Sequence, residues 1–262
     1  MAVSTEDVPV GAAGAEPRRA GRELLLEAVF RPLATAFVPL LQLLRVPPPV
    51  VVLLNAATGL VAALCIARGD LLVGAVVLQL KTLLDNMDGQ LARASGRVTL
   101  AGRYLDTLAD LVVNAALFTA LGYITGQPVL AGAAFVALTI VLAVDFNVTE
   151  LYREAHGLSA RQPQMTGGRV ERLLASAYAL LFAPLDRVIR SVAGRRFASG
   201  TSYDERTVTV LANMGLTTQL GVLGVCLALG VPSLYLWLVL ACLVGLGPLQ
   251  VRAERRARAV LA

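Results

Sequence analysis

Four aspartates stand close together in the sequence: Asp85, Asp88, Asp106 and Asp110. The first two are three residues apart and the last two are four residues apart, so each pair would share one face of an α-helix. Two adjacent helices would then bring four carboxylates together. Such a cluster repels itself and is costly near hydrocarbon, and a bound cation is the natural remedy.

The ligand chemistry indicates which cation this would be. Carboxylate oxygens with no neighbouring histidine or cysteine suit Mg²⁺ or Mn²⁺, with Ca²⁺ as a competitor. Four carboxylates suffice for two ions, an arrangement that clamps a phosphoryl group during a displacement reaction. The four aspartates are therefore candidate metal ligands.

Small and basic residues around the aspartates fit the same role. Gly89 directly follows the second aspartate and lets the backbone approach a ligand closely. Ala92 leaves room on the metal face, and Arg93 offers a bidentate fork to a phosphate. Lys81, the only lysine of the chain, lies four residues before Asp85 and can pair with it across one helical turn.

The elements that must position these residues are apolar segments of membrane-spanning length. The chain has 262 residues, of which 56% are hydrophobic and 16% charged, whereas a soluble domain is about 45–50% apolar and about 25% charged. The apolar residues come in long blocks, which predicts an all-α integral membrane protein. We expect six transmembrane helices, at about 50–67, 71–91, 104–125, 128–148, 208–229 and 232–251.

Arginines indicate the orientation of these helices. They cluster before the first span, between spans two and three, between spans four and five, and after span six, while the alternate loops carry few charges. The positive-inside rule then places both termini and the four aspartates in the cytoplasm. The sequence pI of about 9.5 follows from this arginine bias. No aromatic-rich basic motif indicates a nucleic-acid partner.

The chain divides accordingly. Residues 1–22 show no periodicity and are expected to form a disordered cytoplasmic tail, and 23–46 is apolar but interrupted by charges and prolines, which predicts an interfacial juxtamembrane helix before the spans. The region 151–206 is expected to be a cytoplasmic insert with an amphipathic helix near 170–192, because its apolar run at 173–185 is too short to cross a bilayer. The remaining expected segments are spans one to four within 47–150 with the motif at 85–110, spans five and six within 207–251, and a basic cytoplasmic tail at 252–262.

The motif has the spacing Asp85-x2-Asp88-Gly89-x2-Ala92-Arg93-x8-Gly102-x3-Asp106-x3-Asp110. At every defined position it resembles the pattern of the CDP-alcohol phosphotransferase family, also called CDP-alcohol phosphatidyltransferases. The predicted topology also resembles that family, with six spans, an interfacial helix before them and the motif on the cytoplasmic side. The resemblance covers roughly 23–150 well and 207–250 by topology only.

The resemblance implies an enzyme of phospholipid biosynthesis. Such enzymes transfer a phosphoryl-alcohol unit from a CDP-alcohol to an acceptor hydroxyl and release CMP. It implies that Asp85, Asp88 and Asp106 hold the divalent metals, with Asp110 sharing in this and acting as the general base. Residues implied to line the CDP site are Gly89, Ala92, Arg93 and Gly102. A homodimer in a bacterial or archaeal cell membrane is compatible with the family.

The acceptor alcohol is not readable from the sequence, although some polar residues are candidates for its site. These candidates lie beside the motif or near the end of span four: Lys81, Asp145, Asn147, Glu150 and Arg153. CDP-diacylglycerol is the expected donor, because the site opens to lipid and cytoplasm together. A soluble CDP-alcohol with a lipid or inositol-phosphate acceptor is the alternative within the enzyme class. A metal-ion transporter that uses intramembrane carboxylates is the alternative from another class.

Overall fold

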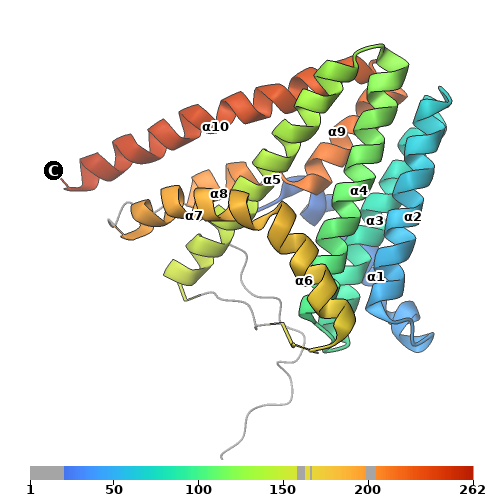
Figure 1. Ribbon diagram of the computed structural model, residues 1–262, viewed down its shortest axis with the longest axis horizontal. Helices are drawn as coiled ribbons and strands as arrows, with labels where there is room; N and C mark the ends of the chain where they lie inside the picture. The colour runs from blue at the N-terminus through green and yellow to red at the C-terminus, as the bar shows by residue number, and fades with distance from the viewer. Residues whose placement is uncertain (1–20, 158–162, 166, 199–204, 262) are drawn as a thin grey trace, which may run out of the picture.

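The structure is a computed structural model that describes residues 21–157, 163–165, 167–198 and 205–261, and almost all of the predicted tail at 1–22 lies outside these ranges. The described residues are helical with no named strand, which confirms the predicted all-α class (Figure 1). In chain order the elements are a short π-helix η1 (Leu26–Phe30), α1 (Arg31–Leu43), α2 (Pro48–Ala67), α3 (Leu71–Ala94), α4 (Leu100–Thr125), α5 (Pro128–Ala155), α6 (Arg169–Leu181), α7 (Ala183–Ala198), α8 (Glu205–Ala212), α9 (Leu216–Ala228) and α10 (Pro232–Leu261).

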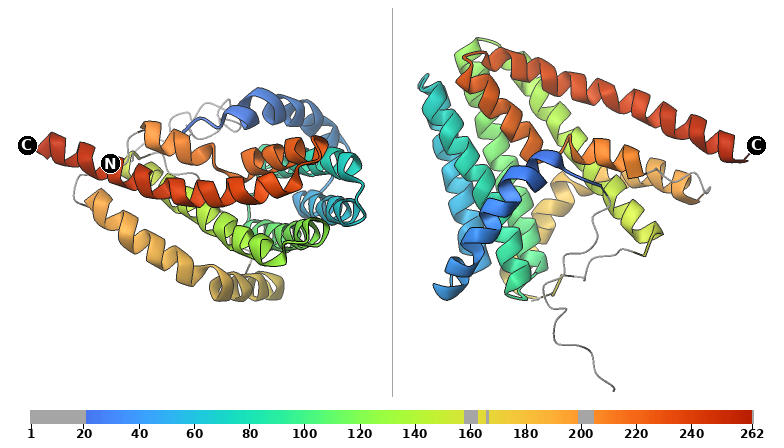
Figure 2. Two further views of the ribbon diagram at one scale, coloured as in Figure 1. Left: turned by 90° about the horizontal axis from the view of Figure 1, so that it is seen from above. Right: turned by 180° about the vertical axis from the view of Figure 1, so that it is seen from behind.

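The centre of the fold is the group α2, α3 and α4. Helix α2 packs against both α3 and α4, while α9 and α1 pack against α3. Helix α5 pairs with α4, and α10 pairs with α5 and leans away from the central group towards its C-terminal end (Figure 1). Figure 2 shows η1 and α1 running along the central group on the face opposite to α6. The aspartate-bearing helices α3 and α4 are thus held in place from several sides.

Local sequence signals explain where the central helices begin and end. Proline occupies the first turn of α2, where its missing N–H costs nothing. Thr99 caps α4 by accepting a hydrogen bond from the backbone N–H of Gly102 at 3.1 Å. The chain turns between α3 and α4 at Gly96 and leaves α4 at Gly126, both at a positive φ of 67° that glycine adopts without strain.

Glycines also let the helices approach one another. A Cβ at Gly59 on α2 would collide with the side chain of Val113 on α4, and a Cβ at Gly224 on α9 would collide with Gln79 on α3. Between the helices lies an apolar core that includes Leu117, Phe118 and Tyr235. Close contacts between small residues are a main source of helix association in a membrane, where burial gives little driving force.

Helices of membrane-spanning length and apolarity number five in the described residues: Leu26–Leu43, α2, α4, α5 and Pro232–Leu249. A sixth results if α8 and α9, which are bent by 44° relative to each other, form one broken span. The count therefore agrees with the predicted six, but two assignments differ. Every 18-residue window of α3 contains Lys81, Asp85 and Asp88, so α3 exceeds the charge expected of an apolar span.

The predicted interfacial helix at 23–46 is the other difference. It contains η1 and α1, which are together long and apolar enough to cross a membrane. The predicted fifth span is interrupted between α8 and α9, where Asn213 donates a hydrogen bond to the carbonyl of Arg22 at 2.6 Å and accepts one from the backbone N–H of Leu24 at 3.0 Å. The segment preceding η1 thus binds the break in this span.

The insert at 151–206 contains two helices where one amphipathic helix near 170–192 was predicted. Helix α6 ends at Leu181 and α7 begins at Ala183, with Phe182 between them. Helix α6 packs against α4 and α7 packs against α5. Helix α10 continues as a helix through the predicted basic tail as far as Leu261.

Candidate functional site

Three of the four aspartates converge. Asp85 and Asp88 from α3 and Asp106 from α4 each offer one carboxylate oxygen, and these three oxygens all lie within 4.8 Å of one another. Asp88 is 7% exposed. The prediction that two helices bring their carboxylates together is therefore borne out in geometry for these three residues.

Two oxygens of this cluster lack a partner. Asp88 Oδ2 and Asp106 Oδ1 are buried and have no hydrogen-bond partner among the described residues. A buried polar atom without a partner calls for an explanation, and a bound ion is one of the few available. Hard oxygen donors with excess negative charge match the preference of Mg²⁺, Mn²⁺ and Ca²⁺. The residues present therefore fit a divalent metal.

Asp110 has a different environment from the other three. Lys81 Nζ lies 2.7 Å from Asp110 Oδ1 and 3.3 Å from Asp85 Oδ1. Asn55 on α2 donates to the same Asp85 oxygen at 2.9 Å. Asp110 therefore faces the Lys81 ammonium, whereas Asp85 both contacts Lys81 and belongs to the three-aspartate cluster.

Lys81 itself is fully buried. Its predicted contact with Asp85 is confirmed, and its closer contact with Asp110 joins two helices that no local spacing relates. Because Lys81 has no exposed surface and its ammonium is paired with two carboxylates, its side chain is not available to contact an acceptor alcohol. Asn55 is not among the candidate site residues predicted from the sequence, although it stands out as a buried amide in a mostly apolar helix α2.

The candidate nucleotide residues lie towards the turn between α3 and α4. Arg93 is exposed, and a Cβ at Gly89 would come within 3.3 Å of Arg93 Nη1. The absence of a side chain at Gly89 thus leaves room for the guanidinium beside the aspartates. Ala92 is on the same last turns of α3, and Gly102 is in the first turn of α4. All four lie one to five residues from the nearest aspartate along their helix, where a phosphate near the aspartate cluster could reach them.

The candidate acceptor residues of α5 differ in their partners. Arg153 Nη1 pairs with Glu150 Oε1 at 2.8 Å, while Arg153 Nε is buried without a hydrogen-bond partner in the described part of the chain. Asp145 accepts a hydrogen bond from Thr149 at 3.4 Å. Arg153 therefore keeps one buried donor that an anionic ligand could use.

Asn147 points instead towards the insert. It donates to Asp186 Oδ1 on α7 at 2.8 Å and accepts from Arg190 Nε at 3.1 Å. Tyr178 on α6 donates its hydroxyl to Asp186 Oδ2 at 2.7 Å. Asn147 thus anchors the insert to α5 within this network.

The insert also contacts α4 close to the aspartates. The rings of Tyr178 and Tyr104 lie 5.1 Å apart, and Tyr104 is two residues before Asp106. Backbone hydrogen bonds join Gln164 to the residues just before α4, with Gln164 N donating to Val98 O at 2.9 Å and Leu100 N donating to Gln164 O at 3.0 Å. Burial and the hydrogen bond to Asp186 raise the pKa of the Tyr178 hydroxyl, which therefore stays a neutral donor. Sequence reasoning missed these contacts.

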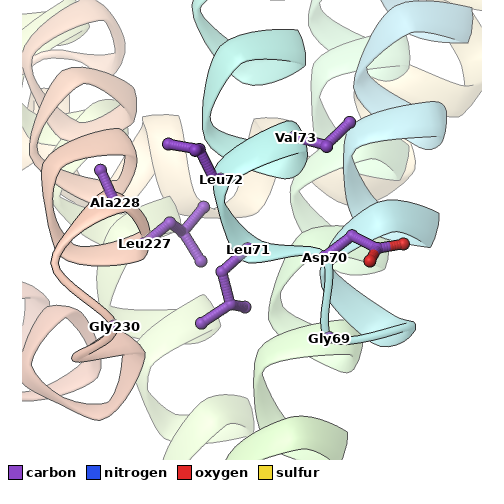
Figure 3. A pocket seen from close by; sticks show the side chains of 8 residues that line it. All are labelled: Gly69, Asp70, Leu71, Leu72, Val73, Leu227, Ala228 and Gly230. Carbon is purple, nitrogen blue, oxygen red and sulfur yellow. The ribbon is translucent and has the colours of Figure 1, made fainter.

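A separate cavity lies at the opposite end of α3 (Figure 3). It has a volume of about 430 Å³ and is open. Its lining comes from the α2–α3 and α9–α10 turns and the adjoining ends of α3 and α9: Gly69, Asp70, Leu71, Leu72, Val73, Leu227, Ala228 and Gly230. Leu71 and Asp85 are separated by about 21 Å along the helix axis, so this cavity is distinct from the aspartate site.

An all-helical bundle of membrane-length helices with a buried carboxylate cluster defines a polytopic membrane protein with a candidate divalent-cation site. The particular family follows from sequence comparison. The profile of CDP-alcohol phosphatidyltransferases matches residues 44–244, and the chain belongs to this family. The match includes the whole motif from Asp85 to Asp110.

Curated relatives give the next level of detail. The chain is 32% identical over 166 residues to a phosphatidylinositol phosphate synthase of Streptomyces avermitilis, with 61% of this chain and 66% of the relative covered. It is 35% identical over 130 residues to a phosphatidylinositol phosphate synthase of Corynebacterium glutamicum, with 49% and 58% covered. A bifunctional IPC transferase and DIPP synthase of Thermococcus kodakarensis is 29% identical over 144 residues, with 53% and 33% covered.

The matched region thus spans less than two thirds of each of these relatives. No solved structure matches the chain.

Proposed function

We propose that this protein transfers a phosphatidyl group from a CDP-alcohol, with CDP-diacylglycerol as the donor, to an acceptor hydroxyl and releases CMP. The observation that carries the proposal is the cluster of Asp85, Asp88 and Asp106 with its two buried unpartnered oxygens. This cluster coincides with the motif of the family to which the chain belongs. The exposed guanidinium of Arg93 beside it supports a phosphate-bearing substrate.

Each residue has a role in this reaction. Asp85, Asp88 and Asp106 would hold Mg²⁺ or Mn²⁺, as one or two ions, which when bound neutralise the negative charge of the diphosphate. Arg93 would bind a diphosphate oxygen, with Gly89, Ala92 and Gly102 leaving room for the nucleotide.

Asp110 would accept the proton of the acceptor hydroxyl as its oxygen attacks the phosphorus that carries the diacylglycerol. A new P–O bond to the acceptor forms, the P–O bond to CMP breaks, and CMP leaves with the electron pair. The product is a phosphodiester, and no covalent enzyme intermediate is required. Asp110 suits the role because its described contacts are through Oδ1 alone, so that Oδ2 would be the oxygen that accepts the proton.

Inositol phosphate is the acceptor that we propose first. Two relatives are named phosphatidylinositol phosphate synthases. Arg153 supports an acceptor with a phosphate, because its Nε is a buried donor without a described partner and a guanidinium binds phosphate well. Glu150, paired with Arg153 at 2.8 Å, and Asp145 would contact the hydroxyls of the acceptor.

The site would face the cytoplasm in a bacterial or archaeal cell membrane, with both termini on the same side. Support comes from the arginine bias of the loops and from the need of a water-soluble nucleotide to leave. The chain would act as a homodimer, as its family resemblance suggests.

The decisive experiment measures CMP release by the purified full chain in detergent micelles. CDP-diacylglycerol and Mg²⁺ or Mn²⁺ are present in every reaction. Inositol phosphate, inositol, glycerol phosphate and serine are tested one at a time as acceptors, and the lipid product is identified by mass. We expect turnover with inositol phosphate, its loss in Asp88→Asn, and its retention in Asp70→Asn, a matched aspartate change at the distant cavity. A protein that turns over no CDP-alcohol but carries Mn²⁺ into vesicles in an Asp88-dependent way is a transporter, and the proposal then fails.

A further inference from the structure

Lys81 occupies an unusual position for a charged side chain. It is the only lysine of the chain and is 0% exposed. Its stem lies beneath Gly59 of α2, where an added Cβ would lie 3.3 Å from Lys81 Cγ. The small residue at 59 therefore allows α2 to cover the lysine and separate it from surrounding solvent or lipid.

The ammonium of Lys81 links Asp110 to Asp85, which is a member of the three-aspartate cluster. It contacts Asp110 Oδ1 at 2.7 Å on α4 and Asp85 Oδ1 at 3.3 Å on its own helix. Asn55 donates to the same oxygen of Asp85 at 2.9 Å. One oxygen of each carboxylate is thereby fixed, because a buried charge-assisted hydrogen bond is short and directional.

We infer that Lys81 is a positioning residue that orients Asp110 for proton transfer and at the same time opposes metal binding at Asp85. The inference rests on the proposed function for the role of Asp110. The part that concerns metal binding depends only on the aspartate cluster. The positive charge of Lys81 competes with a divalent cation for the same carboxylate, so the site holds its metal less tightly than the aspartates alone would allow.

This double role predicts opposite changes in two measurements. Lys81→Met keeps the length of the side chain and removes the charge. The dissociation constant for Mn²⁺ is measured by electron paramagnetic resonance, with the metal alone added to the full chain in micelles. We expect it to fall about tenfold, which corresponds to about 1.4 kcal/mol, because the competing positive charge is gone. We expect kcat to fall at least about 100-fold, with KM for CDP-diacylglycerol changed by less than about threefold, as for loss of an oriented base. A residue that only supports the fold would weaken both metal binding and turnover.

A second variant covers the case in which Lys81→Met does not fold. Removing one partner leaves buried carboxylates without their counter-charge, which is strongly destabilising. Lys81→Met combined with Asp110→Asn removes a positive and a negative charge together, so its melting temperature should exceed that of the single variant. It should bind Mn²⁺ within about threefold of the wild type and remain inactive. Lys81→Arg, which keeps the charge, should keep Mn²⁺ affinity within the same range.

Each outcome supports or overturns the inference. Weaker Mn²⁺ binding in a folded Lys81→Met protein overturns it, as does turnover within threefold of the wild type. If the single variant is unfolded, a double variant that gains no stability over it or that regains activity overturns it. A wild-type protein that turns over no CDP-alcohol refutes the proposed function, while the Mn²⁺ affinities still decide whether Lys81 opposes the metal.

Discussion

The contact between the insert and the helix bundle can be tested at one residue, Asp186. Its two carboxylate oxygens accept hydrogen bonds from Asn147 on α5 at 2.8 Å and from Tyr178 on α6 at 2.7 Å. Asp186→Ala removes both bonds. Because Asn147 also donates to the carbonyl of Ala143 at 2.9 Å, helix α5 itself should stay intact. The expected damage is therefore confined to the docking of α6 and α7.

The free energy lost in docking the insert can be worked out from these two hydrogen bonds. A hydrogen bond to a charged group contributes about 1.5–3 kcal/mol, and both bonds here are only partly buried, so the lower end applies. Loss of both gives about 3 kcal/mol, or roughly a 100-fold increase in the open population of the insert. Tyr178→Phe removes one bond and keeps the ring that contacts Tyr104, so it should give about 1.5 kcal/mol and roughly a tenfold increase.

Amide hydrogen exchange with mass spectrometry on the full chain in micelles is the assay, because it reports local opening segment by segment. Protection across α6 and α7 should fall in proportion to these values, while α2 and α9 stay protected. Arg187→Ala is the matched control on α7, since the described contact of its guanidinium is with the carbonyl of Ala183 within the same helix. Unchanged protection of α6 and α7 in Asp186→Ala would refute the reasoning, and so would a uniform loss over the whole protein.

Three further predictions concern the metal, the base and the core. Asp88→Asn keeps the shape of the side chain but removes one of the three clustered carboxylates. The rise in melting temperature on adding Mn²⁺ should therefore disappear, while the melting temperature in a chelator should not be lowered. A metal-dependent rise equal to that of the wild type would contradict the assignment of the cluster as the metal site. Asp110→Asn should abolish CMP release and leave Mn²⁺-dependent CDP binding within about threefold of the wild type, and loss of nucleotide binding by equilibrium dialysis would mean that Asp110 is mainly a ligand. Tyr235 is fully buried and its hydroxyl has no described hydrogen-bond partner, so Tyr235→Phe should be neutral or stabilise the protein by about 1 kcal/mol, and a lower melting temperature would show that the hydroxyl is satisfied.

The sequence was sufficient for the class of fold and for the central chemistry. Blocks of apolar residues predict helices because every backbone group in a membrane must be paired within its own segment. The aspartate spacing predicts shared faces because the helix period is fixed, and the structure brings Asp85, Asp88 and Asp106 together accordingly. Gly59 and Gly224 are also visible in the sequence, although their packing partners are not.

Only the tertiary structure decided how these faces are arranged. Local spacing relates Lys81 to Asp85, but the shorter contact of Lys81 with Asp110 requires α2 to pack against both α3 and α4 and so bring their side chains within reach of each other. Asn147 was grouped with Asp145 by its position in the chain, whereas its amide is directed to Asp186 of the insert. Helix α3 carries more charge than an apolar span because its charged residues are paired or clustered with residues of other helices. A sequence pattern fixes which residues share a face of one helix, while contacts between helices depend on packing distances and charge pairing that no local period encodes.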